Sequence, residues 1–465
     1  MQQRLVGNSV MKTVVAAVIL SGTAILKSHA QTNSINAFSP YSMFGIGELS
    51  TQGTLPMRSM GGVGIAWRSS SMTSLLNPAG YSATMRKSFI FNFGVEGMNI
   101  VNSQNKYDTS GNKTGMAKNA KNSVNFHDIA LQMPLAKGLG LGLSLTPYSS
   151  VGYNMTTTEQ SDDIWGQIGR VQYNYTGEGD ITEVKLGVGW EIFKNFSLGV
   201  AGMYYWGDID RDYTAFVKND IVGVGNYSST IGTDNYSVSS FKFQAGLQYN
   251  IIANDKRMLT VGATYDLGGS LRPKLTRSIY NDDINSTTVT YENSSSQIRL
   301  PEQWAAGVFY QDARIAVGFD YVYQNWGGRN SKISEQIYGG YTVSYVNTST
   351  FKVGIEYTPN RFDVRHYYNR MAYRLGFRYG GYYQSYQGEK IDQYAITAGF
   401  GFPIRFLGAS AIDFGVEFGG RGSLKSVNSS ISNAKIGLIK QQYIKFAIGL
   451  TMFGEDYWFV RPKYD

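Results

Sequence analysis

The sequence has no cysteine, and its 465 residues include only three histidines. A chain without cysteine forms no disulfide and no thiolate metal site, and it has no cysteine nucleophile. Beyond residue 30 the only histidines are His127 and His366. Neither stands in a serine–histidine–aspartate pattern or in a metal-ligand pattern. We therefore predict that the protein is not an enzyme and holds no cofactor.

Charged residues are also scarce, at 16% of the chain, whereas about a quarter is usual in soluble proteins. The formal net charge of +8 is spread along the sequence without a lysine- or arginine-rich run. This modest excess does not indicate a nucleic-acid partner.

Long apolar runs are missing after residue 30, so we expect no membrane-spanning helix, which needs about 20 apolar residues. The first thirty residues resemble a secretory signal peptide. They have a basic start, an apolar stretch over residues 14–26, and the small-x-small pattern Ser28-His29-Ala30. We predict that residues 1–30 are cleaved before Gln31, which leaves open whether translation starts at Met1 or Met11.

Glycine and tyrosine are abundant, with 54 and 34 residues, and most of the chain alternates with a period of two. In residues 139–146, for example, leucine alternates with glycine, serine or threonine. Such alternation predicts strands, because successive side chains of a strand point to opposite faces. We place fourteen runs, centred near residues 92, 129, 144, 187, 202, 244, 262, 306, 320, 353, 377, 398, 416 and 447. Most of these runs approach ten residues, the length that a tilted strand needs to cross a bilayer.

The connections between these runs alternate between short and long. Short turns are predicted at 134–137, 193–195, 254–257, 311–312 and 405–408. Long polar stretches are 100–122, 156–180, 216–235, 271–298, 327–348 and 423–439. Short periplasmic turns and long outer loops are typical of outer-membrane barrels. Two connections fit this scheme less well, since 359–369 is long for the periplasmic side and 385–390 is short for an outer loop.

The predicted fold is therefore all-β: a 14-stranded antiparallel transmembrane β-barrel over residues 87–453. It would lie in the outer membrane of a Gram-negative bacterium with both termini in the periplasm. Residues 454–465 would form a periplasmic C-terminal tail. Partners expected from this location are outer-membrane lipid and lipopolysaccharide.

Residues 31–86 alternate weakly and are too apolar for a free linker, so we predict an N-terminal hatch inside the barrel lumen. Glycines on the inward face of the strands would leave room for it. They are residues 140, 142, 187, 189, 262, 376, 399, 401 and 449.

Two motifs in this segment resemble a known family. Residues 59–66 read Ser-Met-Gly-Gly-Val-Gly-Ile-Ala, and Asn77-Pro78-Ala79 follows. Together they resemble the N-terminal hatch of the FadL/TodX family of hydrophobic-compound transporters. The resemblance implies a fourteen-stranded barrel with a lumenal hatch, in which Asn77, Pro78 and Ala79 are the hatch motif.

Further segments resemble the version of this family that is common in Bacteroidetes. They are residues 39–47, Thr146-Pro147-Tyr148-Ser149, Leu300-Pro301-Glu302, residues 320–326 and Trp458-Phe459-Val460-Arg461. The resemblance covers essentially the whole chain after the signal peptide.

Two functions remain open. The resemblance implies passive transport of small hydrophobic compounds such as long-chain fatty acids. The alternative is a non-transporting scaffold subunit of an outer-membrane secretion or assembly complex, with other outer-membrane proteins as partners. If a hydrophobic ligand binds, hatch residues would build its pocket; they are Phe38, Tyr41, Phe44, Met60 and Leu76.

Inward positions of the strands carry mixed charge, which has two interpretations. The charges either line a polar conduit, or pair with one another and with hatch backbone groups, and we favour pairing.

Asp208, Asp210 and Asp212 are a weak candidate for a metal site. Their spacing matches the start of a calcium loop. However, Tyr213 stands where that loop needs glycine, and Asn219 stands where it needs glutamate. Charge at the outer rim of a strand is the preferred interpretation, and we predict no metal.

Overall fold

The computed structural model describes most of the chain, and all described residues belong to one compact unit, Ile35–Asp465. The described ranges are 39–85, 88–108, 110–158, 170–218, 229–254, 256–271, 274–281, 284–292, 298–331, 334–336, 342–404, 410–428 and 435–455. The predicted signal peptide lies outside these ranges, and so do residues 456–465 of the predicted tail. Among the described residues, no helix is both long and apolar enough to cross a membrane.

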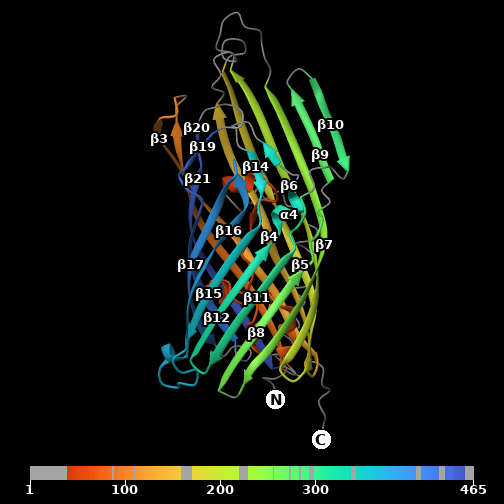
Figure 1. Ribbon diagram of the computed structural model, residues 1–465, viewed down its shortest axis with the longest axis vertical. Helices are drawn as coiled ribbons and strands as arrows, with labels where there is room; N and C mark the ends of the chain where they lie inside the picture. Colours follow the sequence, from red (N-terminus) through yellow and green to blue (C-terminus); the bar gives the residue numbers. More distant parts are fainter. Residues whose placement is uncertain are drawn as a thin grey trace, which may run out of the picture. The chain divides into compact units, whose positions relative to one another are not determined.

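Fourteen strands form a closed antiparallel barrel (Figure 1). Each pairs with the next barrel strand along the chain, and the pairing of the first with the last closes the ring. They are β2 (Ser88–Tyr107), β3 (Lys113–Ala136), β4 (Leu139–Thr158), β5 (Arg170–Phe193), β6 (Phe196–Lys218), β7 (Thr230–Ala253), β8 (Arg257–Asp266), β11 (Gln303–Asp312), β12 (Ile315–Gln324), β15 (Thr348–Tyr357), β16 (Ala372–Tyr386), β17 (Glu389–Ile404), β18 (Ser410–Arg421) and β21 (Ile439–Glu455). Each predicted run falls in one of these strands, so the predicted fold class is confirmed.

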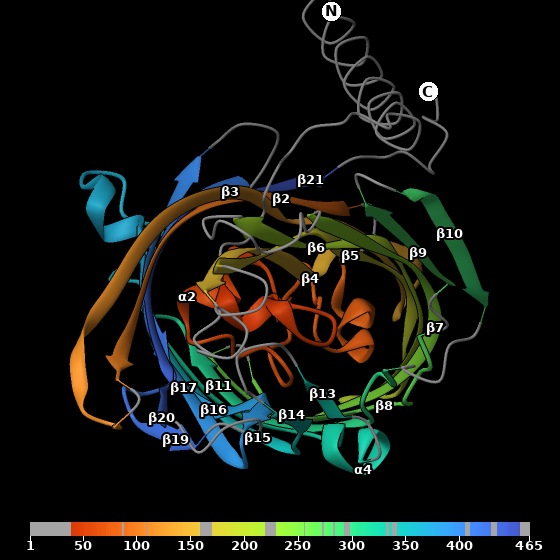
Figure 2. The ribbon, with the colours of Figure 1, turned by 90° about the horizontal axis from the view of Figure 1, so that it is seen from above.

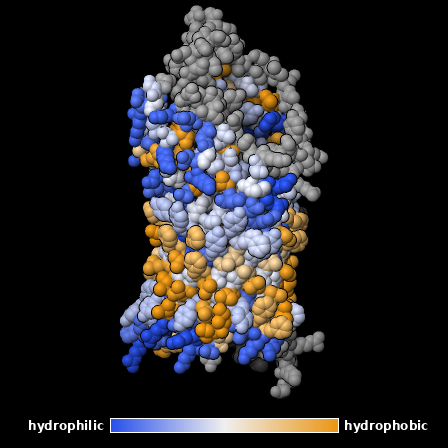
Figure 3. All heavy atoms as spheres, in the orientation of Figure 1, coloured by the Kyte–Doolittle hydropathy of each residue, from blue (hydrophilic) through white to orange (hydrophobic). Residues whose placement is uncertain are grey.

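Large apolar side chains cover the outside of the barrel. Figure 3 shows them gathered in a band around its lower half, between more polar zones. Leu143, Val188, Phe319 and Ile396 belong to this set, and each exposes at least a third of its surface. An exposed apolar belt of this kind is what a lipid-facing barrel wall requires.

The long polar stretches are not loops throughout, which corrects the sequence-based prediction. Strands β2 to β7 run for 20–24 residues, about 65–80 Å at roughly 3.3 Å per residue. They therefore take up much of the predicted loops 100–122, 156–180 and 216–235. The sheet continues beyond the apolar belt because each polar stretch lies beside an antiparallel partner that satisfies its backbone groups.

In their described residues, the remaining long stretches contain short strands and one helix. They hold β9 (Lys274–Asn281) and β10 (Ile284–Glu292), α4 (Trp326–Asn330) with β13 (Ser334–Gln336) and β14 (Thr342–Tyr345), and β19 (Ser426–Asn428) with β20 (Lys435–Gly437). The hairpin β9–β10 prolongs the sheet next to β7.

The two connections that fitted poorly have different structures. The segment 385–390 is a tight turn between β16 and β17, with positive φ at Gln387 (53°) and Gly388 (80°). Two such residues make the turn type that suits the twist of a hairpin. The segment 358–371 remains a long connection between β15 and β16 and contains the 3-10 helix η3 (Tyr367–Arg370). Two short turns are also shifted: β3 runs to Ala136 and the chain turns at residues 137–138, and β11 runs to Asp312 and the chain turns at residues 313–314. The predicted turn 405–408 lies outside the described residues.

The described N-terminal residues, 39–84, lie inside the ring of strands, and we call them the lumenal segment (Figure 2). Of the nine inward glycines, all except Gly401 face it, and Gly401 faces an ion pair of the wall. A Cβ atom at Gly262 would lie 2.6 Å from the carbonyl oxygen of Ile65. Larger residues at these positions would therefore collide with the lumenal segment.

We expect Leu143→Arg to destabilise the barrel by about 2–4 kcal/mol or to block insertion, as arginine does at a bilayer midplane. Leu143 points outward within the apolar belt of β4 and is 44% exposed. Thr156→Arg is the matched control, on an exposed position of the same strand beyond the belt. Urea unfolding in phospholipid vesicles measures both effects. Equal losses at the two positions would contradict the position of the belt.

Candidate functional site: the lumenal segment

The lumenal segment contains little regular structure. Its elements are η1 (Pro40–Met43), β1 (Glu48–Leu49), α2 (Leu55–Ser59) and η2 (Pro78–Ala83). Helix α2 carries a proline in its first turn, where no backbone N–H is needed. The chain then leaves the helix through Gly61 and Gly62, both at positive φ. Backbone groups that these turns leave unpaired must therefore find partners elsewhere.

The first part of the segment joins the barrel wall through a short strand and aromatic packing. β1 pairs with β4, Glu48 opposite Ser150 and Leu49 opposite Ser149. Tyr41 packs edge-on against Tyr386, with ring centroids 5.5 Å apart. These rings belong to a large buried cluster on the inner side of the wall.

The glycine-rich stretch is held through its backbone. Asp320 of β12 accepts hydrogen bonds from the amides of Gly64 (2.7 Å) and Ile65 (3.0 Å). The hydroxyl of Thr397 accepts from the Gly61 amide at 2.9 Å and donates to the Ser59 carbonyl at 2.9 Å. Side chains from two different strands thus provide the hydrogen bonds that a neighbouring strand would provide in a sheet.

Asn77 of the hatch motif is fully buried and bonds three backbone groups. Its side-chain oxygen accepts from the Ala79 amide at 3.0 Å, which starts η2 at Pro78. Its amide group donates to the carbonyls of Ile65 (2.8 Å) and Leu247 (3.1 Å). Asn77 therefore ties the two motifs of the segment to each other and to β7.

Among the described residues, three ion pairs also join the segment to the wall, and two of them are buried. Arg58 pairs with Glu96 of β2, with only 5% and 16% of their side chains exposed. Arg68 pairs with Glu191 of β5 at 3.1 Å. Arg421 of β18 pairs with Glu48 at 2.5 Å. The three wall partners stand on three different strands, so the segment is fixed from several directions.

Other inward charges pair within the wall. Arg374 contacts both Glu356 (2.7 Å) and Asp413 (2.6 Å), and Arg378 contacts Glu417. These contacts agree with the pairing interpretation of the inward charges.

Four of the five predicted pocket residues are described, and they belong to two separate buried clusters. Tyr41 and Phe44 belong to the large aromatic cluster, whereas Met60 belongs to a second buried cluster against which Leu76 packs. Phe38 lies outside the described residues. A common ligand pocket built by these residues stays a prediction.

The weak metal candidate lies along β6. Asp208, Asp210 and Asp212 stand at every second position, so neighbouring carboxylates leave the strand about 7 Å apart. Asp210 accepts a hydrogen bond from Asn235 at 2.5 Å. Among the described residues, no group of three acidic, histidine or cysteine side chains could hold a metal ion. The two histidines also lie apart, His127 in β3 and His366 in the connection 358–371.

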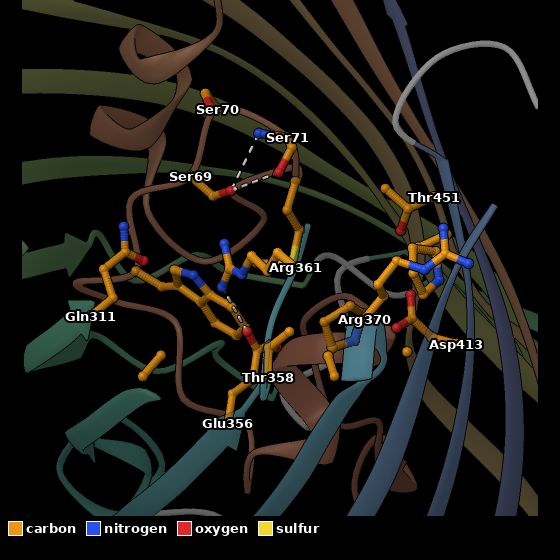
Figure 4. A pocket seen from close by; sticks show the side chains of 18 of the residues that line it. Ser69, Ser70, Ser71, Gln311, Glu356, Thr358, Arg361, Arg370, Asp413 and Thr451 are labelled. Carbon is orange, nitrogen blue, oxygen red and sulfur yellow. Dashed lines mark hydrogen bonds and ion pairs between the residues drawn. The ribbon is translucent and has the colours of Figure 1, made fainter. Parts of the chain in front are cut away.

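A cavity of about 980 Å³ lies below the lumenal segment, and it was not predicted from the sequence. Figure 4 shows polar and charged side chains around it, contributed by the lumenal segment, by the wall and by the connection 358–371. Among them are Ser69, Ser71, Glu356, Arg361 and Asp413. No spacing in the sequence signals it, because its walls come from parts of the chain that are far apart.

Fold and site define a closed transmembrane β-barrel whose lumen holds a segment of its own chain. The chain belongs to the BamG family, whose model matches residues 10–465. No curated protein matches it.

Solved outer-membrane barrels share the fold at low sequence identity. A FadL homologue of Pseudomonas aeruginosa is similar with a TM-score of 0.60 and 14% identity, over 87% of this chain and 99% of that one. The toluene transporter TbuX of Ralstonia pickettii gives 0.53 and 14%, over 86% and 98%. The toluene transporter TodX of P. putida gives 0.54 and 15%, over 87% and 99%. The fold implied by the sequence resemblance is therefore confirmed.

We expect Glu96→Gln to destabilise the protein by about 3–5 kcal/mol, because it leaves the Arg58 guanidinium buried without its partner. The double variant Arg58→Met with Glu96→Gln should regain part of this loss. The control is Lys425→Gln, which breaks an exposed pair with Glu389 and should change stability by less than about 1 kcal/mol. Urea unfolding in vesicles measures all three variants. If Glu96→Gln is as mild as the control, the pair does not anchor the segment.

Proposed function

We propose that the protein is a permanently closed barrel that serves as a non-transporting scaffold subunit of an outer-membrane secretion or assembly complex. The observation that carries this proposal is the fixation of the lumenal segment. A segment that moves to admit a substrate would have to break buried ion pairs and backbone hydrogen bonds together, and each buried charge left unpaired costs about 3–5 kcal/mol.

The character of the lumen supports the same role. Arg374, Arg378, Glu356, Glu417 and Asp413 are all buried or nearly so inside the wall. A passage for apolar solutes needs an apolar lining, whereas these side chains offer charge.

The outside of the barrel offers surface for partners. Strands of 20–24 residues carry the sheet well beyond the apolar belt and present exposed polar and apolar side chains there. Phe216 and Ile231 are examples, 49% and 44% exposed. The family name, BamG, favours a subunit of an assembly machine over a transporter.

Passive transport of hydrophobic compounds such as long-chain fatty acids is the second candidate. Two observations favour it: the fold is shared with solved toluene transporters, and a cavity opens below the lumenal segment. Under this function the lumenal segment would act as a movable hatch, with Asn77-Pro78-Ala79 as its anchor. Tyr41, Phe44, Met60 and Leu76, together with Phe38, would then line a ligand pocket.

The location follows from either function. We propose that residues 1–30 direct export, that residues 31–86 form the hatch domain, and that the barrel lies in the outer membrane among phospholipid and lipopolysaccharide. The end with the short turns would face the periplasm together with both termini and the tail 454–465. Kinship with the Bacteroidetes version of the FadL/TodX family remains part of this proposal.

Purification of the tagged chain from gently solubilised outer membranes tests the scaffold function, together with fatty-acid uptake by cells with and without the chain. We expect a complex with other outer-membrane proteins in fixed stoichiometry and no difference in uptake. Asn77→Ala should leave uptake unchanged as well, since no transport exists to impair.

A monomeric protein whose loss abolishes uptake would overturn the scaffold function and support transport. Reduced uptake in Asn77→Ala would then point to the hatch motif.

A further inference from the structure

The connection 358–371 differs from the other described turns at its end of the barrel. Those turns are tight and polar, for example Lys137-Gly138 and Lys194-Asn195. This connection has fourteen residues between β15 and β16 and includes the 3-10 helix η3. Neither the closure of the barrel nor the fixation of the lumenal segment requires such length.

Internal hydrogen bonds hold the connection in a defined shape. Asp363 accepts from the side chain of Asn369 (2.6 Å) and from the amides of Arg365 (2.8 Å) and His366 (2.9 Å). The bond from Asn369, followed by that from His366, lowers the pKa of Asp363 to about 2. The Asn360 amide donates to the Asn369 carbonyl at 2.8 Å and closes the base. The carboxylate that organises the connection thus stays ionised at every ordinary pH.

This ordered connection presents apolar side chains to the outside. Phe362 is 90% exposed and Val364 is 88% exposed, more than the wall residues of the apolar belt. Tyr368 follows at 58%. Phe362 and Val364 also border the mouth of the cavity, so they stand at the rim of the wall. An ordered apolar surface of this kind indicates a partner that covers it.

The tyrosines of helix η3 pack against the outer face of the wall, whereas Arg370 at its end lines the cavity. The Tyr367 hydroxyl donates to the carbonyl of Pro403 at 3.0 Å, and the Tyr373 hydroxyl donates to the carbonyl of Tyr368 at 3.0 Å. The Tyr373 ring packs edge-on against Phe400, a 45% exposed residue of the outer wall. Figures 1 and 2 show the same turn, in cyan-blue, projecting outside the ring of strands. The exposed rings are thus continuous with the lipid-facing surface.

We propose that the connection 358–371 is a membrane anchor, which lies in the phospholipid headgroup layer at the lower edge of the apolar belt. Tyrosine suits this layer because its ring prefers the apolar side and its hydroxyl the wet side. Arg365 adds positive charge toward lipid phosphates, whereas Arg370 lies over the Tyr367 ring, 4.9 Å from its centroid, and lines the cavity. The contact of these tyrosines with the lipid-facing wall favours lipid over a protein partner. The proposal does not depend on whether the barrel scaffolds or transports.

The absence of cysteine makes a direct test simple, because single introduced cysteines can be labelled specifically. Phe362→Cys and Tyr368→Cys would carry an environment-sensitive fluorophore, and Lys194→Cys, at an exposed tight turn of the same end, is the matched control. Each purified full-length variant is reconstituted into vesicles of phosphatidylethanolamine and phosphatidylglycerol. The vesicles contain lipid that bears a nitroxide quencher either at the headgroup or deep in the acyl chain.

We expect the labels at 362 and 368 to lose most of their emission to the headgroup nitroxide and less to the deep one, since interfacial groups lie about 5–10 Å into the boundary region. The label at 194 should lose little to either. Equal quenching at all three sites would overturn the proposal. Labels at 362 and 368 that stay unquenched in vesicles, yet become shielded in the native complex, would assign this surface to a protein partner instead.

Discussion

An irregular segment enclosed in a closed barrel has little solvent for its backbone N–H and C=O groups, so the groups that its own turns leave unpaired need partners on the barrel wall. The structure depends on this constraint. Asp320 and Thr397 bond the amides of the glycine-rich stretch, and Asn77 bonds the backbone of Ile65, of Ala79 in η2 and of β7. Glycines on the inward face let the segment approach the strands closely enough for these bonds. The charged side chains of the lumen are therefore explained by the lumenal segment that they bind.

Because of the same constraint, the shared fold alone does not determine the function of this protein. Fourteen-stranded barrels of this shape include solved toluene transporters, and sequence identity with them is 14–15%. At that level the likeness concerns the path of the backbone and leaves the lumen side chains undetermined. In this chain, pairs such as Arg58–Glu96 and Arg421–Glu48 join the segment to the wall. These buried pairs hold the segment rigidly, which suits the proposed scaffold function.

The sequence predicted the fold better than the site. Period-two alternation located every barrel strand, because a lipid-facing wall requires an apolar residue at every second position. The alternation did not predict strands beyond the apolar belt, where outward residues need not be apolar. There, polar stretches such as 156–158 and 170–180 continue as strands. Inward glycines indicated a segment in the lumen. Inward charges were expected to pair with one another and with hatch backbone groups, as Asp320 does. The individual partners, and the role of Thr397, could not be predicted, since these contacts form only after the barrel has closed.

The central claim is that the lumenal segment closes the barrel permanently, and single-channel recording in planar bilayers tests it most directly. The intact protein should stay nearly non-conducting without opening events, because its anchors do not release together. A variant that lacks residues 37–80 should insert and conduct ions steadily, which proves that an emptied barrel can be detected. An intact protein that conducts like an open porin, or that opens and closes repeatedly, would contradict the account.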